Sequence, residues 1–244
     1  MTEELFREDA MLRECEARVI AVDAAGIQLD RTVFYPMGGG QAGDAGALRL
    51  GDGREIRIVD TRKGAQPGEI VHLPAPEADL SSLRVGSTVT AAIDWTRRHR
   101  HMRFHTATHL LCALVPHPVD GCSITADYAR LDFHMTEPLD KEALTHGLAR
   151  LVAEAHPVSH RWISEAELDA NPGLVRSMSV QPPRGHGRVR VLEISGVDLQ
   201  PCGGTHVANT AEIGPVVVTK IEKKSAKTRR VVLGFADPVR AGSA

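Results

Sequence analysis

The sequence predicts an α+β protein, with a small β-barrel domain over residues 1–96 and a mixed α/β domain with an antiparallel sheet over residues 97–244. Short β-rich runs separated by glycine-rich turns fill the first 95 residues, a pattern typical of a small barrel or sandwich. Amphipathic helical patterns begin only after Trp95 and are followed by further strands, which is typical of an α+β unit.

The first part of the chain shows the period-two alternation of strands. Ile56 and Ile58 share one face of their run, as do Val89, Ala91 and Ile93 in a later run. Three further runs are rich in β-branched residues and end at turn residues. The expected strands are residues 17–22, 26–30, 32–35, 54–60 and 87–94.

The second part combines helices with strands. Asp140 can cap a helix over residues 137–156, with Leu139 and Leu144 as its hydrophobic staple, and Ser164 begins a capping box. The apolar stripe of the first of these helices is Leu144, Leu148, Leu151 and Ala155. The remaining expected elements are a helix over 105–115 and strands over 188–194, 215–221 and 229–235.

Composition places the chain among ordinary soluble globular proteins, with 42% hydrophobic and 25% charged residues. No apolar run approaches the ~18 residues of a membrane span, and the acidic first residues are no secretory signal, so we expect a cytoplasmic protein. The four cysteines form no CxxC pair; three are expected to be small buried residues, and Cys202 stands apart.

A net charge of −2 requires any nucleic-acid partner to bind local basic patches. Two runs are candidates, and each can equally be a solvated charged face. The first contains Arg97, Arg98, Arg100 and Arg103 with His99 and His101 between them. The second contains Lys220, Lys223, Lys224, Lys227, Arg229 and Arg230.

Two histidine-containing motifs carry the chemistry. His105 and His109 are four residues apart in a helical segment, which puts both imidazoles on one face. Cys202 and His206 have the same spacing in a glycine-containing turn. An N/S donor set of this kind suits zinc best. Four protein ligands indicate a closed structural site, whereas catalysis needs a position open to water, and the spacing leaves both open.

Four segments together resemble a known family. They are HTATHLL at 105–111, CGGTHVANTAEIG at 202–214, PPRGHGRVRVLEI at 182–194 and the glycine-rich YPMGGGQAGDAG at 35–46. The chain resembles the editing domain of alanyl-tRNA synthetases and, equally, their free-standing relatives, the AlaX trans-editing proteins. The resemblance covers roughly residues 30–235.

The resemblance implies one zinc ion per chain, held at His105, His109, Cys202 and His206, and hydrolysis of seryl or glycyl esters on alanine tRNA. It implies a barrel domain followed by an editing domain. The chain is too short for a synthetase catalytic domain and has no long C-terminal extension, so we expect the medium-length type, acting in trans. The family's description also includes ATP binding, to which we assign no residue. A monomer and a homodimer are both compatible with the sequence.

Candidate substrate contacts follow from position alone. Thr125, with Ser123 second, is the expected reader of a serine hydroxyl, and the alternative is a hydroxyl satisfied within a strand or turn. Gln41 and Asp44 in the glycine-rich loop are expected to contact the tRNA end, to pack, or both. The expected tRNA-binding residues are Lys223, Lys224, Lys227, Arg229 and Arg230.

Three rival functions remain compatible with the sequence. A tRNA-binding module with a structural zinc would leave the ester intact. A hydrolase for another aminoacyl-tRNA, such as Ser-tRNA(Thr), would share the motifs, because threonyl-tRNA synthetases carry a similar editing unit. A zinc hydrolase of small esters or amides is the third, and the basic run near residue 224 disfavours it.

Overall fold

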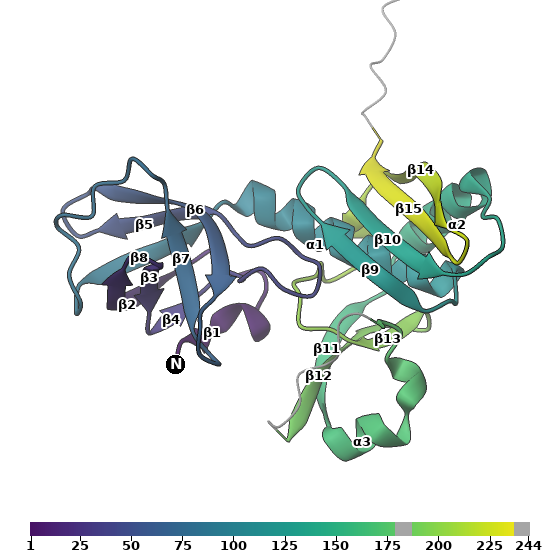
Figure 1. Ribbon diagram of the computed structural model, residues 1–244, viewed down its shortest axis with the longest axis horizontal. Helices are drawn as coiled ribbons and strands as arrows, with labels where there is room; N and C mark the ends of the chain where they lie inside the picture. The colour runs from purple at the N-terminus through teal and green to yellow at the C-terminus, as the bar shows by residue number, and fades with distance from the viewer. Residues whose placement is uncertain (179–186, 237–244) are drawn as a thin grey trace, which may run out of the picture. The chain divides into compact units, whose positions relative to one another are not determined.

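The computed structural model describes residues 1–178 and 187–236 of the chain (Figure 1). Two compact units make up the protein, Met1–His101 and Met102–Ala244. Helix α1 (Trp95–Leu114) contains the point of division, and the boundary predicted near residue 96 lies in the same helix. None of the helices in the described ranges is long and apolar enough to cross a membrane. Residues 182–186 of one quoted motif lie outside the described residues.

The first unit contains a closed barrel, as predicted, in which every neighbouring pair of strands is antiparallel. Closure leaves no unpaired sheet edge. The alternating residues Ile56, Ile58, Val89 and Ala91 are buried in its core. In spatial order the strands are β2 (Glu14–Asp23), β3 (Gly26–Leu29), β7 (Ile70–Pro74), β6 (Glu55–Lys63), β5 (Gly46–Leu50) and β8 (Thr88–Ile93).

The strand predicted over residues 32–35 is wrong for most of its length. Strand β4 (Arg31–Thr32) pairs in parallel with β1 (Glu3–Glu4) and ends there, before a buried irregular segment. The backbone N–H groups of Phe34 and Tyr35 donate to side chains, the Thr32 hydroxyl at 3.0 Å and the Asp44 carboxylate at 2.7 Å. These bonds replace a strand ladder, so β-branched and aromatic composition alone was misleading here.

The second unit holds a four-stranded antiparallel sheet, as predicted, in the order β14 (Val216–Ser225), β15 (Thr228–Phe235), β10 (Ala129–His134) and β9 (Val119–Ile124). Helix α2 (Lys141–Ala153) packs against β14. The predicted cap is confirmed, because the Asp140 carboxylate accepts hydrogen bonds from the backbone N–H groups of Glu142 and Ala143. The stripe residues Leu144, Leu148 and Leu151 are buried. Ala155 was wrongly included in the stripe, because the helix ends at Ala153 and Ala155 is exposed with a positive φ.

A separate three-stranded sheet, β11 (Val158–Ser164), β12 (Arg188–Ile194) and β13 (Asp198–Pro201), lies beside α3 (Glu165–Ala170) in the same unit (Figure 1). The predicted Ser164–Glu167 capping box begins α3. One face of this sheet builds a small core with α3, from Ile163, Leu168, Val189 and Val191. The opposite face carries the even-numbered residues of the three strands, such as Arg190 and Gln200. This face is the one that contributes to the candidate metal centre described below.

Candidate metal centre

Helix α1 supplies the first two side chains of the site. His105 and His109 are one helical turn apart, and their ring centroids lie 5.6 Å from each other. Their exposed fractions are 5% and 7%, so both imidazoles are turned into the unit. The helix begins ten residues before the segment in which helical spacing was expected. The pattern did not predict this start, because the first turns are rich in arginine and histidine and carry no apolar stripe.

The loop after β13 supplies the other two. Cys202 continues the pairing with β12, since its N–H donates to the Arg190 carbonyl at 3.1 Å. The Arg190 guanidinium donates to the carbonyl oxygens of Cys202 (2.9 Å) and Gly204 (3.1 Å), which fixes the path of the loop. His206, with 6% of its surface exposed, lies beside the other donors. A buried arginine therefore holds the Cys202–His206 turn in place.

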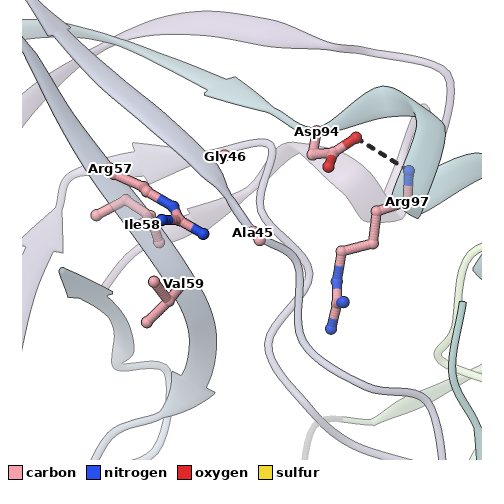
Figure 2. Close-up of a pocket in the computed structure, with 7 residues that line it drawn as sticks. All are labelled: Ala45, Gly46, Arg57, Ile58, Val59, Asp94 and Arg97. Atoms are coloured by element: carbon pink, nitrogen blue, oxygen red, sulfur yellow. Dashed lines mark hydrogen bonds between the residues drawn. The ribbon is translucent and has the colours of Figure 1, made fainter. Parts of the chain in front are cut away.

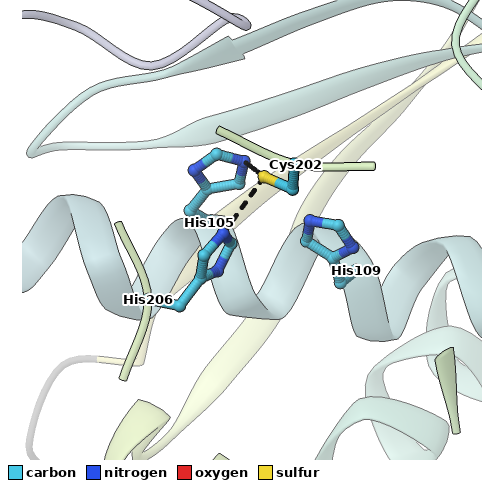
Figure 3. Close-up of side chains that lie close together, drawn as sticks. All are labelled: His105, His109, Cys202 and His206. Carbon is cyan, nitrogen blue, oxygen red and sulfur yellow. Dashed lines mark hydrogen bonds between the residues drawn. The ribbon is translucent and has the colours of Figure 1, made fainter. Parts of the chain in front are cut away.

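The structure brings together all four side chains that the two sequence motifs singled out (Figure 3). One potential ligand atom from each of His105, His109, Cys202 and His206 lies within 4.8 Å of the other three. The Cys202 Sγ is 3.2 Å from His206 Nε2 and 3.5 Å from His105 Nε2. Ligand atoms on a tetrahedral zinc are roughly 3.3–3.8 Å apart, given the usual Zn–N and Zn–S bond lengths. The donor set and its spacing thus fit a metal ion of this kind.

The outward nitrogens of two of these histidines are held by further side chains. His109 Nδ1 lies 2.8 Å from Asp198 Oδ2, and the Gln200 amide donates to both oxygens of that carboxylate. His206 Nδ1 lies 3.2 Å from the Thr106 hydroxyl, which itself donates to the Met102 carbonyl. In both rings these partners favour a proton on Nδ1, which leaves the Nε2 lone pair for a metal.

Sequence reasoning missed Asp198, Gln200 and Thr106. The alternation of Asp198 and Gln200 places them on one face of β13, but nothing local tells which face meets α1. The contact from Asp198 to His109 spans 89 residues of sequence. Only the tertiary structure could reveal it.

The electrostatics favour metal-binding protonation states at Cys202 and His206, whereas His109 has to release a proton when a metal binds. Burial raises the pKa of the Cys202 thiol, but the neighbouring His105 and His206 outweigh it and hold that pKa well below its usual value. Burial, with the nearby His105, lowers the pKa of His206 to about 3. Burial also lowers the pKa of His109, but the Asp198 and Cys202 hydrogen bonds raise it to about 10. A thiolate beside an unprotonated imidazole is the form in which such groups bind metals.

The predicted hydroxyl readers lie in and next to the turn between β9 and β10. The Thr125 hydroxyl donates to the Tyr128 carbonyl and accepts from the N–H groups of Asp127 and Tyr128, so it stabilises that turn. Ser123 lies opposite Arg130, on the other face of β9 from Cys122. Burial raises the pKa of the Cys122 thiol, and the nearby Cys202 raises it further. The structure therefore gives Thr125 a local role and directs Ser123 away from that face.

The glycine-rich loop is held inside the first unit. Asp44 is 1% exposed and its carboxylate forms an ion pair with the fully buried Arg98. Arg98 also donates to the Val33 and Ala10 carbonyls. Gln41 is fully buried as well. These contacts favour the packing alternative for Gln41 and Asp44, since the Asp44 carboxylate is buried. They correct the expectation for Arg98, which is not part of a surface patch because a buried carboxylate compensates its charge.

The predicted tRNA-binding residues divide into three groups. Arg229 is 8% exposed, and its guanidinium donates to the carbonyls of Ser225, Thr228 and Thr136, so it closes the β14–β15 turn instead of facing a partner. Lys224 and Arg230 are paired with Asp132. The exposed Lys223 and Lys227 have no ion-pair partner in the part of the chain that the structure describes.

A cavity of about 370 Å³ opens in the first unit, between the barrel strands and the start of α1 (Figure 2). Two guanidinium groups, those of Arg57 and Arg97, lie at its wall together with Asp94. The Asp94 carboxylate accepts the Arg97 N–H at 3.0 Å and so caps the helix. None of the four clustered donors lines this cavity.

Comparison with known proteins agrees with the fold and the site. The family described as "Threonyl and Alanyl tRNA synthetase second additional domain" matches residues 189–232, which include Cys202 and His206. The family described as "tRNA synthetases class II (A)" matches residues 6–97, which include the barrel. One chain thus combines a barrel unit that matches a synthetase family model with a second unit that matches the additional-domain model and contains the His/Cys cluster.

Individual relatives identify the family more closely. The chain is 35% identical to the alanyl-tRNA editing protein AlaX-M of Methanosarcina mazei, over 97% of this chain and 98% of that protein. It is 34% identical to the AlaX-M protein of Saccharolobus solfataricus, over 95% and 98%. It is also 34% identical to the alanine–tRNA ligase of Thermococcus kodakarensis, but covers only 26% of that enzyme. The chain belongs to the AlaX-M family of alanyl-tRNA editing proteins.

Proposed function

We propose that this protein is a zinc-dependent aminoacyl-tRNA deacylase that hydrolyses mischarged alanine tRNA in trans. Seryl-tRNA(Ala) is its main substrate and glycyl-tRNA(Ala) its second. The observation that carries the proposal is the convergence of His105, His109, Cys202 and His206 in a member of the AlaX-M family. Action in trans is supported by the alignment, which covers nearly all of the AlaX-M relatives but only a quarter of the alanine ligases.

Zinc is the ion that this donor set suits best, because three imidazoles and one thiolate are its usual ligands. When bound, zinc polarises a carbonyl oxygen and lowers the pKa of a bound water from ~16 to ~7. The residues of this chain hold the ligand atoms in place: Asp198 orients His109, Thr106 orients His206, and Arg190 fixes the Cys202 loop. His206 is unprotonated at neutral pH, which suits a metal ligand, whereas its pKa of about 3 makes it a weak base.

Substrate selection needs residues besides the four donors. We keep Thr125 as the proposed reader of the seryl hydroxyl. The turn uses all three hydrogen-bonding positions of the Thr125 hydroxyl, so the substrate has to replace one of these bonds. For the tRNA backbone we propose Lys223 and Lys227, which are exposed and form no ion pair with a carboxylate within residues 1–178 and 187–236.

Metal analysis joined to single-turnover deacylation tests the proposal. The wild type should contain about one zinc per chain, and removal of the metal by a chelator should abolish hydrolysis of seryl-tRNA(Ala). His109→Ala should lower kcat/KM by at least ~100-fold, the scale of damage at metal sites. Asp120→Ala, at an exposed ion pair with His134, is a matched control that should keep metal and activity. A metal-free protein with full activity would sink the zinc mechanism.

A further inference from the structure

The three-stranded sheet aligns three side chains in a row that leads away from the metal centre. Trp162 on β11 lies directly opposite Arg190 on β12, and Cys202 continues the pairing on the far side of Arg190. Side chains directly opposite each other on antiparallel strands project from the same face. Asp198 and Gln200, which reach His109, belong to that face as well. Trp162 and the site therefore share one surface of one sheet.

The spacing along this row suits a single nucleotide. Neighbouring strands lie ~4.8 Å apart, so the backbone of Trp162 is roughly 10 Å from that of Cys202, with one strand between them. In an aminoacyl-tRNA the reacting ester sits on the ribose of the terminal nucleotide, and the base lies at the other end of the same sugar. A terminal nucleotide whose ester is at the Cys202 end of the row can thus reach Trp162 with its base.

The chemistry at the outer end of the row matches a base and its phosphate. The Arg188 guanidinium carbon lies 4.4 Å from the centroid of the Trp162 ring, so a planar cation and a planar aromatic group are stacked together. Arg188 is exposed and Trp162 is only partly buried. Aromatic rings and guanidinium planes are the surfaces on which proteins stack unpaired bases, and the guanidinium also complements a phosphate.

Among the residues that the structure describes, the core of this sheet does not account for a tryptophan at this position. The core between this sheet and α3 is formed on the opposite face, by Ile163, Val189, Val191 and Leu168. Trp162 does not contribute to that core, and its neighbour in the strand, Ile163, does. A large ring kept at the solvent edge, on the face of the metal centre, is better explained by a ligand than by the core.

We propose that Trp162, together with Arg188, forms the stacking platform for the terminal base of the tRNA whose ester enters the metal centre. This inference rests on the proposed function and adds the residues that hold the 3′ end. The platform positions the substrate and takes no part in bond cleavage. Its loss should therefore raise KM and leave kcat almost unchanged.

The direct test replaces the terminal adenine of uncharged tRNA(Ala) with the fluorescent base 2-aminopurine and adds the full-length protein. The wild type should quench the fluorescence, because stacking on an indole quenches this base. Trp162→Leu keeps apolar volume without a ring; it should lose the quenching and weaken binding by roughly 5- to 100-fold, the usual contribution of one stacked base. Trp162→Phe should restore most of both.

Further controls separate stacking from charge and from folding. Arg188→Ala should weaken binding. Arg161→Ala should not, because this substitution removes an equal charge from the opposite face of the sheet. On tRNA that lacks the terminal adenosine, wild type and Trp162→Leu should bind equally well. Circular dichroism of Trp162→Leu should match that of the wild type.

The outcomes distinguish this inference from the function on which it rests. Quenching that persists in Trp162→Leu, or an unchanged KM for seryl-tRNA(Ala) in that variant, would overturn the stacking platform alone. Quenching by the wild type without any hydrolysis of the mischarged tRNA would support the platform and overturn the deacylase proposal.

Discussion

The hydrogen bond between Asp198 and His109 is the contact on which the geometry of the metal centre depends most. The carboxylate is 1% exposed, lies 2.8 Å from His109 Nδ1 and receives two hydrogen bonds from Gln200. Asp198→Asn preserves the shape of the side chain but removes its charge. The asparagine oxygen can still accept a hydrogen bond from His109 Nδ1, so the protein should fold. This neutral hydrogen bond is weaker and orients the imidazole less firmly, so we expect weaker metal binding.

The size of the loss follows from the nature of the bond. Hydrogen bonds to a charged group contribute about 1.5–3 kcal/mol, and mutation of such outer partners usually costs 10- to 100-fold in metal affinity. A 10- to 100-fold loss corresponds to about 1.4–2.8 kcal/mol, so the two ranges agree. Asp198→Ala should lose more, because it leaves Gln200 without its acceptor as well.

Competition with a chromophoric zinc chelator measures this affinity directly, without reference to catalysis. Asp132→Asn is the matched control, since Asp132 is also a buried carboxylate of the second unit but pairs with Arg230 and Lys224. That variant should bind zinc like the wild type. Equal affinities for wild type and Asp198→Asn would refute the conclusion that Asp198 positions His109.

Three further predictions concern other parts of the chain. Joint replacement of Lys223 and Lys227 by alanine should raise KM and reduce the slope of log K against log salt by about 1.5, as expected for two lost phosphate contacts, and an unchanged slope would make this surface a solvated face. Thr125→Val should cost ~1–3 kcal/mol on seryl-tRNA(Ala) and less on glycyl-tRNA(Ala), while equal losses would show that the hydroxyl serves only the turn. Burial lowers the pKa of His72 to about 4, so the unfolded chain binds a proton that the folded chain excludes. Stability should therefore fall by up to about 3 kcal/mol between pH 6.5 and 4, and urea unfolding of His72→Gln should show a smaller fall in this range.

Local patterns predicted the parts of the structure that local physics determines. The Asp140 cap and the Ser164 capping box lie next to the helices that they begin, and both are confirmed. The strand alternation around Ile56 and Val89 predicted the barrel core for the same reason. The spacing of the two histidines on α1 needed only the helical period.

The parts that were missed depend on contacts between distant segments. The run of arginines and histidines after Trp95 looked like a surface patch, but Arg98 is buried because Asp44, 54 residues earlier, compensates its charge. The same ion pair keeps the Asp44 carboxylate buried. Asp198 could not be recognised as the partner of His109, because a carboxylate on a short strand is ordinary until the fold places it against a helix.

The most direct test of the proposed editing function is deacylation of seryl-, glycyl- and alanyl-tRNA(Ala), with Ser-tRNA(Thr) beside them, by the zinc-loaded wild type. We predict the fastest hydrolysis for seryl-tRNA(Ala), slower hydrolysis for glycyl-tRNA(Ala), and no hydrolysis of alanyl-tRNA(Ala). Faster hydrolysis of Ser-tRNA(Thr) would move the protein to the threonine side of its family. Hydrolysis of alanyl-tRNA(Ala) as fast as seryl-tRNA(Ala) would contradict the account, because an enzyme that destroys the correct product does not edit.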